Sequence, residues 1–251
     1  VDATKGWLST AAAKASDISS PQFVTATGGT ITTSGDFKIH TFTGPGTFCV
    51  SNAGNPSGSN TVDYMIIAGG GSGANGGGGA GGYRSSGFGP SPLRGSALPV
   101  SVQGYPVVVG SGASGEPNLS TAGPNGNPSS FSSITSTAGG GGAFGSTAGG
   151  SGGSGGGQAG SSYGSGAKGS GNTPPVSPPQ GNPGGDKGPN GPGSAGGGGA
   201  GGTGGASSGS SGGPGGTGVA NAITNSCTQY ASGGSGGGDS GGPQAATPGG
   251  G

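Results

Sequence analysis

Residues 238–243 read Gly-Asp-Ser-Gly-Gly-Pro, the pattern around the nucleophilic serine of chymotrypsin-like serine proteases. That chemistry also needs a histidine to take the serine proton and a buried aspartate to orient the histidine. The one histidine, His40, stands in a Lys-Ile-His-Thr run typical of a strand, where we interpret it as a satisfied strand residue and not a base or ligand. Because a tract rich in glycine and serine produces this pattern by accident, it does not predict a protease.

Residues 71–76, Gly-Ser-Gly-Ala-Asn-Gly, follow an apolar run at 62–68 and imitate the dinucleotide-binding fingerprint. In that fingerprint a helix begins at the glycines, and its N-terminus holds the pyrophosphate. Residues 76–82 are almost all glycine and cannot form such a helix, and no acidic residue follows at the distance expected for the ribose contact. The sequence therefore predicts no nucleotide cofactor.

The remaining reactive side chains are scattered along the chain. No histidine–cysteine cluster has the spacing of a metal site, so we expect no metal, no cofactor and no enzyme. Cys49 and Cys227 are far apart in sequence. A disulfide between them would close a long loop and stabilise a fold that lacks a core. Two isolated buried thiols are the alternative, and both interpretations remain open.

Composition excludes several classes of function. Formal net charge is zero and only 6% of residues are charged, so the chain lacks the basic surface that nucleic-acid binding requires. No apolar run approaches the roughly 20 residues needed to cross a bilayer, so we expect no membrane insertion. The chain begins at Val1 without a signal-peptide pattern, and we expect it to be part of a longer product. Hydrophobic residues make up 25% of the chain, too few for an ordinary apolar core.

A Gly-Gly-X repeat with a small X dominates the sequence and is clearest at 198–206 and 212–217. A period of three matches the left-handed polyproline-II helix, which has no internal hydrogen bonds. We expect a bundle of polyglycine-II helices whose backbones bond sideways and whose X residues face outward. The runs without X, at 139–142 and 196–199, are expected to have neighbours on every side.

Two other interpretations of the repeat were weighed. Collagen has one glycine per triplet with proline-rich X and Y positions, which does not fit two glycines in three. Disorder is the stronger alternative, because 74 glycines and 20 prolines in 251 residues is a low-complexity composition. We favour an ordered bundle.

The predicted fold class is mostly irregular and all-β: a polyglycine-II bundle interleaved with a small β-sheet or sandwich layer. Residues 1–22 are expected to be a connector with one or two helical turns, and residues 23–251 a glycine-rich domain. Within that domain, residues 23–68 are β-rich and residues 69–251 form the bundle with short strands. The expected strands are 37–42, 47–50, 62–68, 98–102, 105–109 and 131–137. The expected loops are 84–97, 115–128, 158–192 and 219–232.

Binding residues concentrate in loops held on a rigid scaffold, and tyrosine and arginine are common anchors. Several such side chains, and others suited to contact, lie in or beside the expected loops. These candidate receptor-binding residues are Tyr83, Arg84, Phe88, Tyr163, Lys168, Lys187 and Tyr230. For Tyr83 and Tyr230 the alternative is that they close the ends of the bundle.

Five stretches together resemble glycine-rich tail-fibre and adhesin proteins of tailed bacteriophages, particularly those of cyanobacterial and marine phages. They are residues 42–50 (Phe-Thr-Gly-Pro-Gly-Thr-Phe-Cys-Val), 62–71 (Val-Asp-Tyr-Met-Ile-Ile-Ala-Gly-Gly-Gly), 77–84, 107–110, and 130–131 together with 134–142. The resemblance covers roughly Phe37 to the C-terminus. It implies a virion tail-fibre protein, extracellular, that contacts a host cell-surface glycan or protein through variable loops. It also implies other fibre subunits as partners in a homo-oligomer, with a trimer as one candidate.

The sequence thus predicts a non-enzymatic structural and binding protein. Two alternatives remain open. One is an architectural filament or matrix protein without a ligand. The other is an ice-binding protein that presents ordered small side chains from a flat polyglycine-II face.

Overall fold

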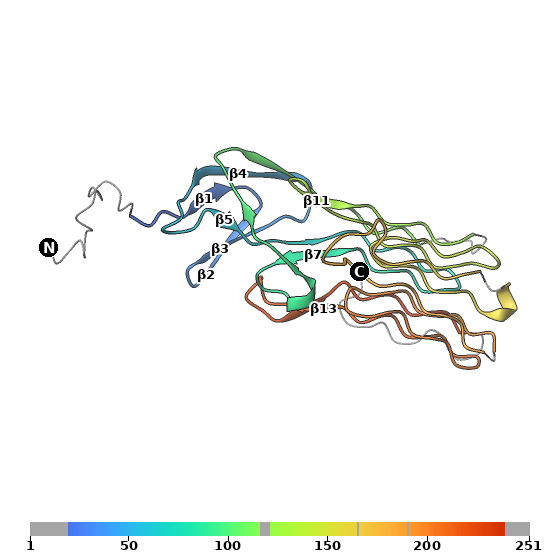
Figure 1. The fold of residues 1–251 in the computed structure, drawn as a ribbon. Coiled ribbons are helices and arrows are strands. Elements are labelled where there is room, and N and C mark those ends of the chain that lie inside the picture. The colour runs from blue at the N-terminus through green and yellow to red at the C-terminus, as the bar shows by residue number, and fades with distance from the viewer. Residues whose placement is uncertain (1–19, 116–120, 165, 190, 239–251) are drawn as a thin grey trace.

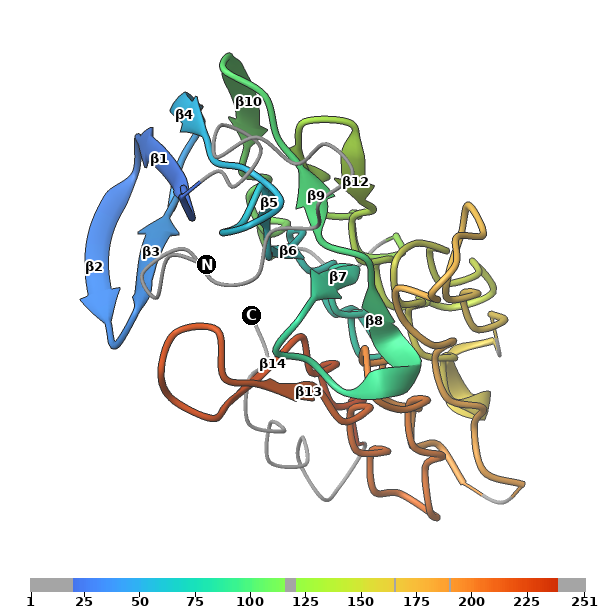
Figure 2. The same ribbon diagram turned by 60° about the vertical axis from the view of Figure 1, so that its left-hand side comes forward.

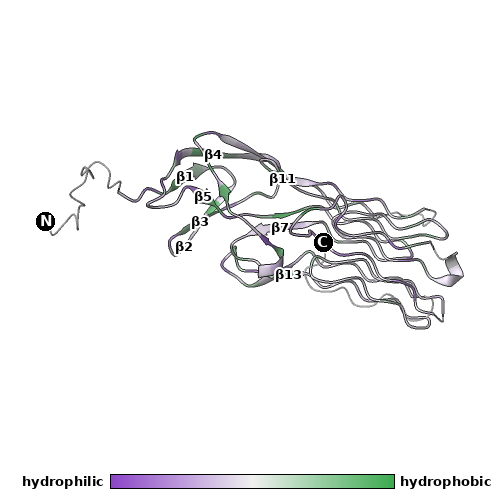
Figure 3. Ribbon diagram, in the orientation of Figure 1, coloured by the Kyte–Doolittle hydropathy of each residue, from purple (hydrophilic) through white to green (hydrophobic). Residues whose placement is uncertain are grey.

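The computed structural model describes residues 20–115, 121–164, 166–189 and 191–238, and it is elongated (Figure 1). One end carries most of the strands, and we call it the β-head (residues 20–67, 83–108 and 129–136). The other end consists of extended segments lying side by side, and we call it the glycine lobe. The lobe comprises residues 68–82, 109–115, 121–128, 137–164, 166–189, 191–218 and 231–238. Figure 3 shows hydrophobic residues mainly in the β-head and near β7, whereas the glycine lobe is almost colourless.

The largest sheet has five strands in the order β1-β4-β10-β11-β12, and every pairing in it is antiparallel. Its strands are β1 (Val24–Thr27), β4 (Gly46–Ala53), β10 (Gly104–Val108), β11 (Ser129–Phe131) and β12 (Ile134–Ser136). Alternation along β4 points Phe48 and Val50 into the core, where they meet Tyr105. The rings of Phe48 and Phe131 pack edge to face at 5.7 Å. This small aromatic cluster is the apolar centre of the β-head.

The other strands form small sheets around this one (Figure 2). The two-stranded sheets pair β2 (Thr30–Ser34) with β3 (Phe37–Thr41), β5 (Thr61–Val62) with β9 (Leu98–Pro99), and β13 (Val219–Asn221) with β14 (Thr228–Tyr230). A three-stranded sheet contains β6 (Met65–Ile67), β7 (Tyr83–Ser86) and β8 (Arg94–Gly95). Short 3-10 turns occur at η2 (Ser91–Leu93) and η3 (Ser161–Tyr163). Within the described residues no helix is long and apolar enough to span a membrane.

The mostly β and irregular fold class is confirmed, but several element boundaries are wrong. The expected strand 62–68 is divided into β5 and β6, and 131–137 belongs to the β11–β12 hairpin, which turns at Ser132 with a positive φ of 55°. The expected loop 219–232 contains the β13–β14 hairpin, and 84–97 contains most of β7 and all of β8. These strands are only two to four residues long, too short for a periodic pattern to mark their limits in the sequence. Most of the expected N-terminal connector, residues 1–19, lies outside the described residues.

Hydrogen bonds between extended segments of the glycine lobe follow a period of three. The N–H groups of Gly76, Gly79 and Gly82 all donate to carbonyls of the segment 137–143, at 2.8–2.9 Å. The next N–H groups along the chain, those of Gly77 and Ala80, donate to carbonyls of another segment, 195–198. The segment 76–82 therefore bonds to two different neighbours on different sides, unlike a strand, whose bonds lie in one plane.

Glycine is needed in this lobe because backbones approach closely. A Cβ at Gly140, Gly141 or Gly142 would overlap a backbone carbonyl, and in each case that carbonyl belongs to a different segment. The glycines of 139–142 and 196–199 are all buried, and none has a positive φ. The prediction that these runs have neighbours on every side is confirmed. These positions need glycine because it has no side chain, and not because it can adopt a left-handed conformation.

The run 198–206 bends at 200–202, where the Gly199 N–H donates to the Gly202 carbonyl at 2.9 Å. One expectation about the repeat is wrong: the X residues do not all face outward, since some small side chains between interior segments are fully buried. Those at 0% exposure include Ala143, Ala159, Ala195, Ser154 and Ser194. A segment surrounded by others has no outward face, so its X positions must be small enough to fit between backbones.

Candidate functional site

The candidate binding residues do not form one site. Four lie in the β-head or at its junction with the glycine lobe, a region formed by β7, η2 and the β13–β14 hairpin (residues 219–230). The other three lie within the lobe. The first group is Tyr83, Arg84, Phe88 and Tyr230; the second is Tyr163, Lys168 and Lys187. The two groups therefore have to be considered as separate surfaces.

Tyr83 is a buried junction residue and not a surface contact, so that part of the prediction is wrong. Only 1% of it is exposed, and it packs against Ala200, Val219 and Ala231. Its hydroxyl accepts a hydrogen bond from Asn221 Nδ2 at 2.6 Å, which satisfies both buried groups. Its position agrees with the alternative interpretation, in which it closes the end of the glycine lobe.

The other junction residues reach the surface to different degrees. Arg84 is half-buried on β7 opposite Ile66. Phe88 is exposed, and its ring packs edge to face with that of Phe37 at 5.8 Å. Tyr230 is half-buried at the end of β14, with its hydroxyl hydrogen-bonded to Thr224 Oγ1 at 3.1 Å. These side chains pack within the junction and the neighbouring hairpin, and they do not converge on one cavity.

A second set of contacts, missed by sequence reasoning, joins residues 174–180, here called the proline-rich loop, to the junction. Gln180 is 1% exposed, and its Oε1 accepts the Thr137 N–H at 2.8 Å. Its Nε2 donates to Thr137 Oγ1 and to the Pro174 carbonyl, while its own carbonyl accepts the Tyr83 N–H. The only available signal was a glutamine between proline and glycine, which by itself indicates an exposed loop.

In the glycine lobe, the two candidate lysines make contacts with neighbouring residues. Lys168 Nζ lies 2.6 Å from Asp186 Oδ2, and both side chains are exposed enough that this ion pair contributes little to stability. Lys187 is half-buried, and its backbone N–H donates to Gln158 Oε1 at 2.9 Å. Tyr163 ends η3, which lies at the end of the molecule farthest from the β-head (Figure 1).

The chain reversals at this end, here called the far-end loops, comprise residues 144–147, 161–164, 187–189 and 208–211. Hydrogen bonds tie these reversals to neighbouring parts of the surface. The Gly145 carbonyl accepts the Gly166 N–H at 2.7 Å, and Ser161 Oγ donates to the Gly191 carbonyl at 2.8 Å. The Gly193 N–H donates to the Gly209 carbonyl at 3.1 Å. The far-end loops are thus linked through the segments beside them, and they include η3 and the half-buried Lys187.

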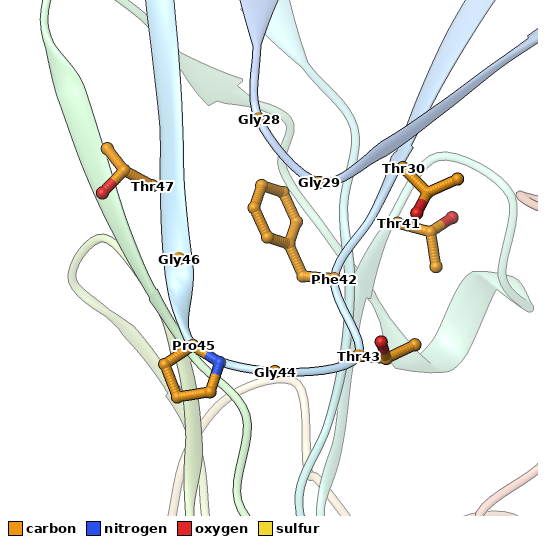
Figure 4. Close-up of a pocket in the computed structure, with 10 residues that line it drawn as sticks. All are labelled: Gly28, Gly29, Thr30, Thr41, Phe42, Thr43, Gly44, Pro45, Gly46 and Thr47. Atoms are coloured by element: carbon orange, nitrogen blue, oxygen red, sulfur yellow. The ribbon is translucent and has the colours of Figure 1, made fainter.

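A shallow cavity of about 320 Å³ lies between the β2–β3 hairpin and β4 (Figure 4). The Phe42 ring stands in its middle, and a Cβ at Gly29 or Gly46 would come within 3.1 Å of that ring. The side chains of Thr41 and Thr43 extend away from the ring, so their hydroxyls do not surround it. The glycines make room for Phe42, and the hollow lacks charged lining residues.

The second cavity, of about 410 Å³, lies at the junction and is lined mainly by apolar groups. Pro92, Leu93 and Val219 form much of its wall, and Asn182 contributes an amide that donates to the carbonyls of Gly199 and Ala200. Its lining lacks an acid, base or nucleophile.

The residues with reactive side chains remain separate. His40 Nδ1 lies 2.8 Å from the Gly28 carbonyl, and its ring packs edge to face with Phe48 at 5.0 Å, as expected of a satisfied strand residue. Asp239 and Ser240 of the protease-like pattern lie outside the described residues. Hydrogen bonds with Ser101 lower the pKa of the Tyr105 hydroxyl from 10.0, but this tyrosine belongs to the β-head core. Within the described ranges, histidine, cysteine and acidic residues form no group of three suited to a metal ion.

Both cysteines are free and exposed, so the structure contains neither the Cys49–Cys227 disulfide nor the pair of buried thiols. Cys49 lies between the inward-pointing Phe48 and Val50 of β4, and alternation therefore turns it to the solvent. Cys227 lies in the turn that precedes β14.

The comparisons with known proteins agree with the composition of the glycine lobe. A family model described as a glycine-rich domain matches residues 41–251. No curated protein and no solved structure matches the chain. Since the matched region includes most of the β-head and the whole glycine lobe, the chain belongs to the glycine-rich domain family.

Proposed function

We propose that this chain is a structural and binding subunit of a phage tail fibre, located in the virion outside the cell. In this proposal the glycine lobe is a bundle of polyglycine-II helices, and the far-end loops contact a host cell-surface glycan or protein. The observation that carries the proposal is the three-residue period of the hydrogen bonds between segments.

That period supports polyglycine-II helices because a threefold chain presents the same face every third residue. The segment 194–200 repeats the pattern that begins at Gly76. Its N–H groups at every third position, Ser194, Gly197 and Ala200, donate to the carbonyls of Gly237, Gly234 and Ala231. Each such bond contributes about 0.5–1.5 kcal/mol net, so many of them can replace the apolar core that this composition lacks. The scaffold would then be rigid without being hydrophobic.

A rigid scaffold with linked reversals at one end suits the display of binding loops. The far-end loops lie opposite the β-head, which leaves the β-head to face other fibre subunits (Figure 1). A homo-oligomer, such as a trimer, would present several copies of the far-end loops to one cell and raise the overall affinity through multivalency. The proposal involves no enzymatic step and no cofactor.

The test is adsorption of the purified full chain to a panel of bacterial cells and to a glycan array. A variant with Ser162→Gly and Tyr163→Gly, which keeps Ser161 and the positive-φ Gly164, should lose binding while keeping the thermal midpoint of the wild type. Gln103→Ala, on the exposed surface of the β-head, is the matched control and should bind normally. Unchanged binding by the far-end variant, or no binding by any form, would overturn the adhesin role.

An architectural filament without a ligand is the second candidate, because both described cavities lack a cluster of reactive or charged groups. Electron microscopy of the source particle separates the two functions. A chain located at a fibre tip supports the adhesin, whereas an unending homopolymer supports the filament.

A further inference from the structure

The outer edge of β2 is an exposed strand edge without the usual protection. Among the described residues β2 pairs with β3 alone, and Figure 2 shows it as the outermost strand of the β-head. The residues from Thr30 to Thr33 are all exposed, and Ile31 is 46% exposed. A free edge presents a row of N–H and C=O groups that can pair with another strand.

Native edge strands are normally blunted by a charge, a proline or a bulge. Other strands of the β-head show these features: β1 is interrupted by a bulge, β8 contains Arg94 and β9 contains Pro99. β2 reads Thr-Ile-Thr-Thr-Ser and has none of them, and its register with β3 is unbroken. Its β-branched residues also favour sheet pairing.

We propose that β2 pairs with β2 of a second copy of this chain, in antiparallel orientation about a two-fold axis at Thr32. In this register Ile31 lies opposite Thr33 of the second copy, and Thr30 lies opposite Ser34. All five residues of β2 are then paired, and the two hairpins become one four-stranded sheet. A two-fold axis gives a closed, self-complementary interface, so the assembly stops at a dimer of sheets.

The neighbours across this sheet are compatible with the pairing. On one face, the observed register places Lys38 beside Thr33 and His40 beside Ile31. Across the four strands of the dimer, the side chains in one row are therefore those of Lys38 and Thr33 from one copy, followed by Ile31 and His40 from the second copy. Strands are about 4.8 Å apart, so the two basic groups are separated by about 14 Å. That distance exceeds the screening length of roughly 8 Å at physiological ionic strength, and their repulsion is small.

The other face brings apolar and hydroxyl groups together. Ile39 lies beside Thr32 in the observed hairpin, so the central row reads Ile39, Thr32, Thr32 and Ile39. Cross-strand pairs of this kind each contribute about 0.2–1 kcal/mol. A five-residue ladder is a small interface, so the dimer should be weak and dependent on concentration. This inference needs only self-association, and it holds whether or not the chain is a fibre component.

Cysteine cross-linking tests the two-fold axis directly. Antiparallel partners have Cα atoms about 4.5–5.5 Å apart, within the range that a disulfide spans. In a Cys49→Ser, Cys227→Ser background, Thr32→Cys should form a covalent dimer on mild oxidation. The control in the same background is Thr47→Cys, an exposed position on the interior strand β4, which should remain a monomer.

Sedimentation equilibrium of the full chain supplies the second readout. The wild type should dimerise as its concentration rises. Thr32→Lys places two like charges face to face on the axis and should remove that dimer, whereas Thr47→Lys should not. Equal circular dichroism spectra establish that the variants are folded. The inference is overturned if Thr32→Cys cross-links no faster than Thr47→Cys, or if Thr32→Lys associates as the wild type does. Neither outcome depends on adsorption to cells.

Discussion

At the scale of single residues, the glycine lobe distinguishes two kinds of glycine. A Cβ at Gly197 would overlap the Gly78 carbonyl of a neighbouring segment. A Cβ at Gly70 would lie 3.6 Å from the Gly79 carbonyl, an ordinary van der Waals contact. Neither glycine has a positive φ, so conformation does not separate them. The sequence shows both within glycine runs, and only the packing tells which one is sterically required.

Alanine substitutions at these two glycines should therefore affect stability differently. Gly197→Ala forces backbones apart and should lower the free energy of unfolding by about 1–3 kcal/mol, as other overpacking substitutions do. Gly70→Ala should be neutral or raise it by about 0.4–1 kcal/mol, because alanine restricts the unfolded chain. Chemical denaturation of both variants measures the difference. Equal effects would mean that the close approach at Gly197 is absent in solution.

Tyr83 shows what its sequence context did not reveal. An aromatic residue after a glycine run fitted either a contact loop or the closed end of a bundle, and its burial against Val219 decides for the second. The partner that satisfies its hydroxyl, Asn221, is 138 residues away along the chain. A local pattern carries no information about a contact at that separation.

Removing the Tyr83 hydroxyl should destabilise the junction. Tyr83→Phe leaves the buried Asn221 amide without its acceptor, which should cost about 1–3 kcal/mol. Tyr230→Phe is the matched control, since its hydroxyl bond to Thr224 is exposed and its loss should change stability by less than about 0.5 kcal/mol. Thermal unfolding of the two variants, followed by circular dichroism, tests the ranking. It fails if Tyr230→Phe is the more damaging change.

At the scale of elements, the sequence predicted β3, β4 and β10 closely, whereas it missed or misplaced most of the strands that are only two to four residues long. Residues 37–42 were expected as a strand, and β3 covers all but the last of them. The run 62–68 was expected as one strand and is interrupted at Asp63 and Tyr64. There Ser86 Oγ donates to Asp63 Oδ1 at 2.8 Å and accepts the Tyr64 N–H at 3.0 Å. This tertiary contact replaces the ladder bonds that the apolar pattern implied.

We expect the hydrogen bonds of Gln180 to hold the proline-rich loop in place. Gln180→Met keeps a similar volume but leaves the Thr137 N–H without its acceptor, so the free energy of unfolding should fall by about 1–3 kcal/mol. Gln103→Met removes an exposed side-chain bond to Ser101 and should change it by less than about 0.5 kcal/mol. Urea unfolding compares them. Equal stability of the two variants would show that the loop is held by its prolines alone.

At the scale of the whole molecule, stability is distributed over backbone hydrogen bonds and not concentrated in charges or a large core. The buried apolar residues form small clusters, and the formal net charge is zero. Composition correctly excluded an ordinary core, and the family match agrees with the glycine-rich character. The order in which segments neighbour one another could not be predicted, because Gly-Gly-X repeats are nearly identical and any segment can accept bonds from any other.

If those bonds act as one network, amides in different segments should be protected from hydrogen exchange together. The N–H groups of Gly140, Gly157 and Gly198 bond across three different pairs of segments at 2.8–2.9 Å. We expect all three to exchange slowly although they lie outside every sheet, and Gly197→Ala to lower their protection in parallel. Gly70→Ala is the control and should leave them unchanged.

The β-head supplies the internal reference for this experiment, because the Val50 N–H bonds to the Gln103 carbonyl at 2.9 Å and is independent of the glycine lobe. Its exchange rate should be the same in the wild type and in Gly197→Ala. A loss of protection at Gly198 alone would mean that each segment opens by itself. A parallel loss at Val50 would mean that the β-head and the glycine lobe unfold as one unit. Only a loss shared by Gly140, Gly157 and Gly198, with Val50 unchanged, fits a lobe stabilised by sideways bonding of its own backbone.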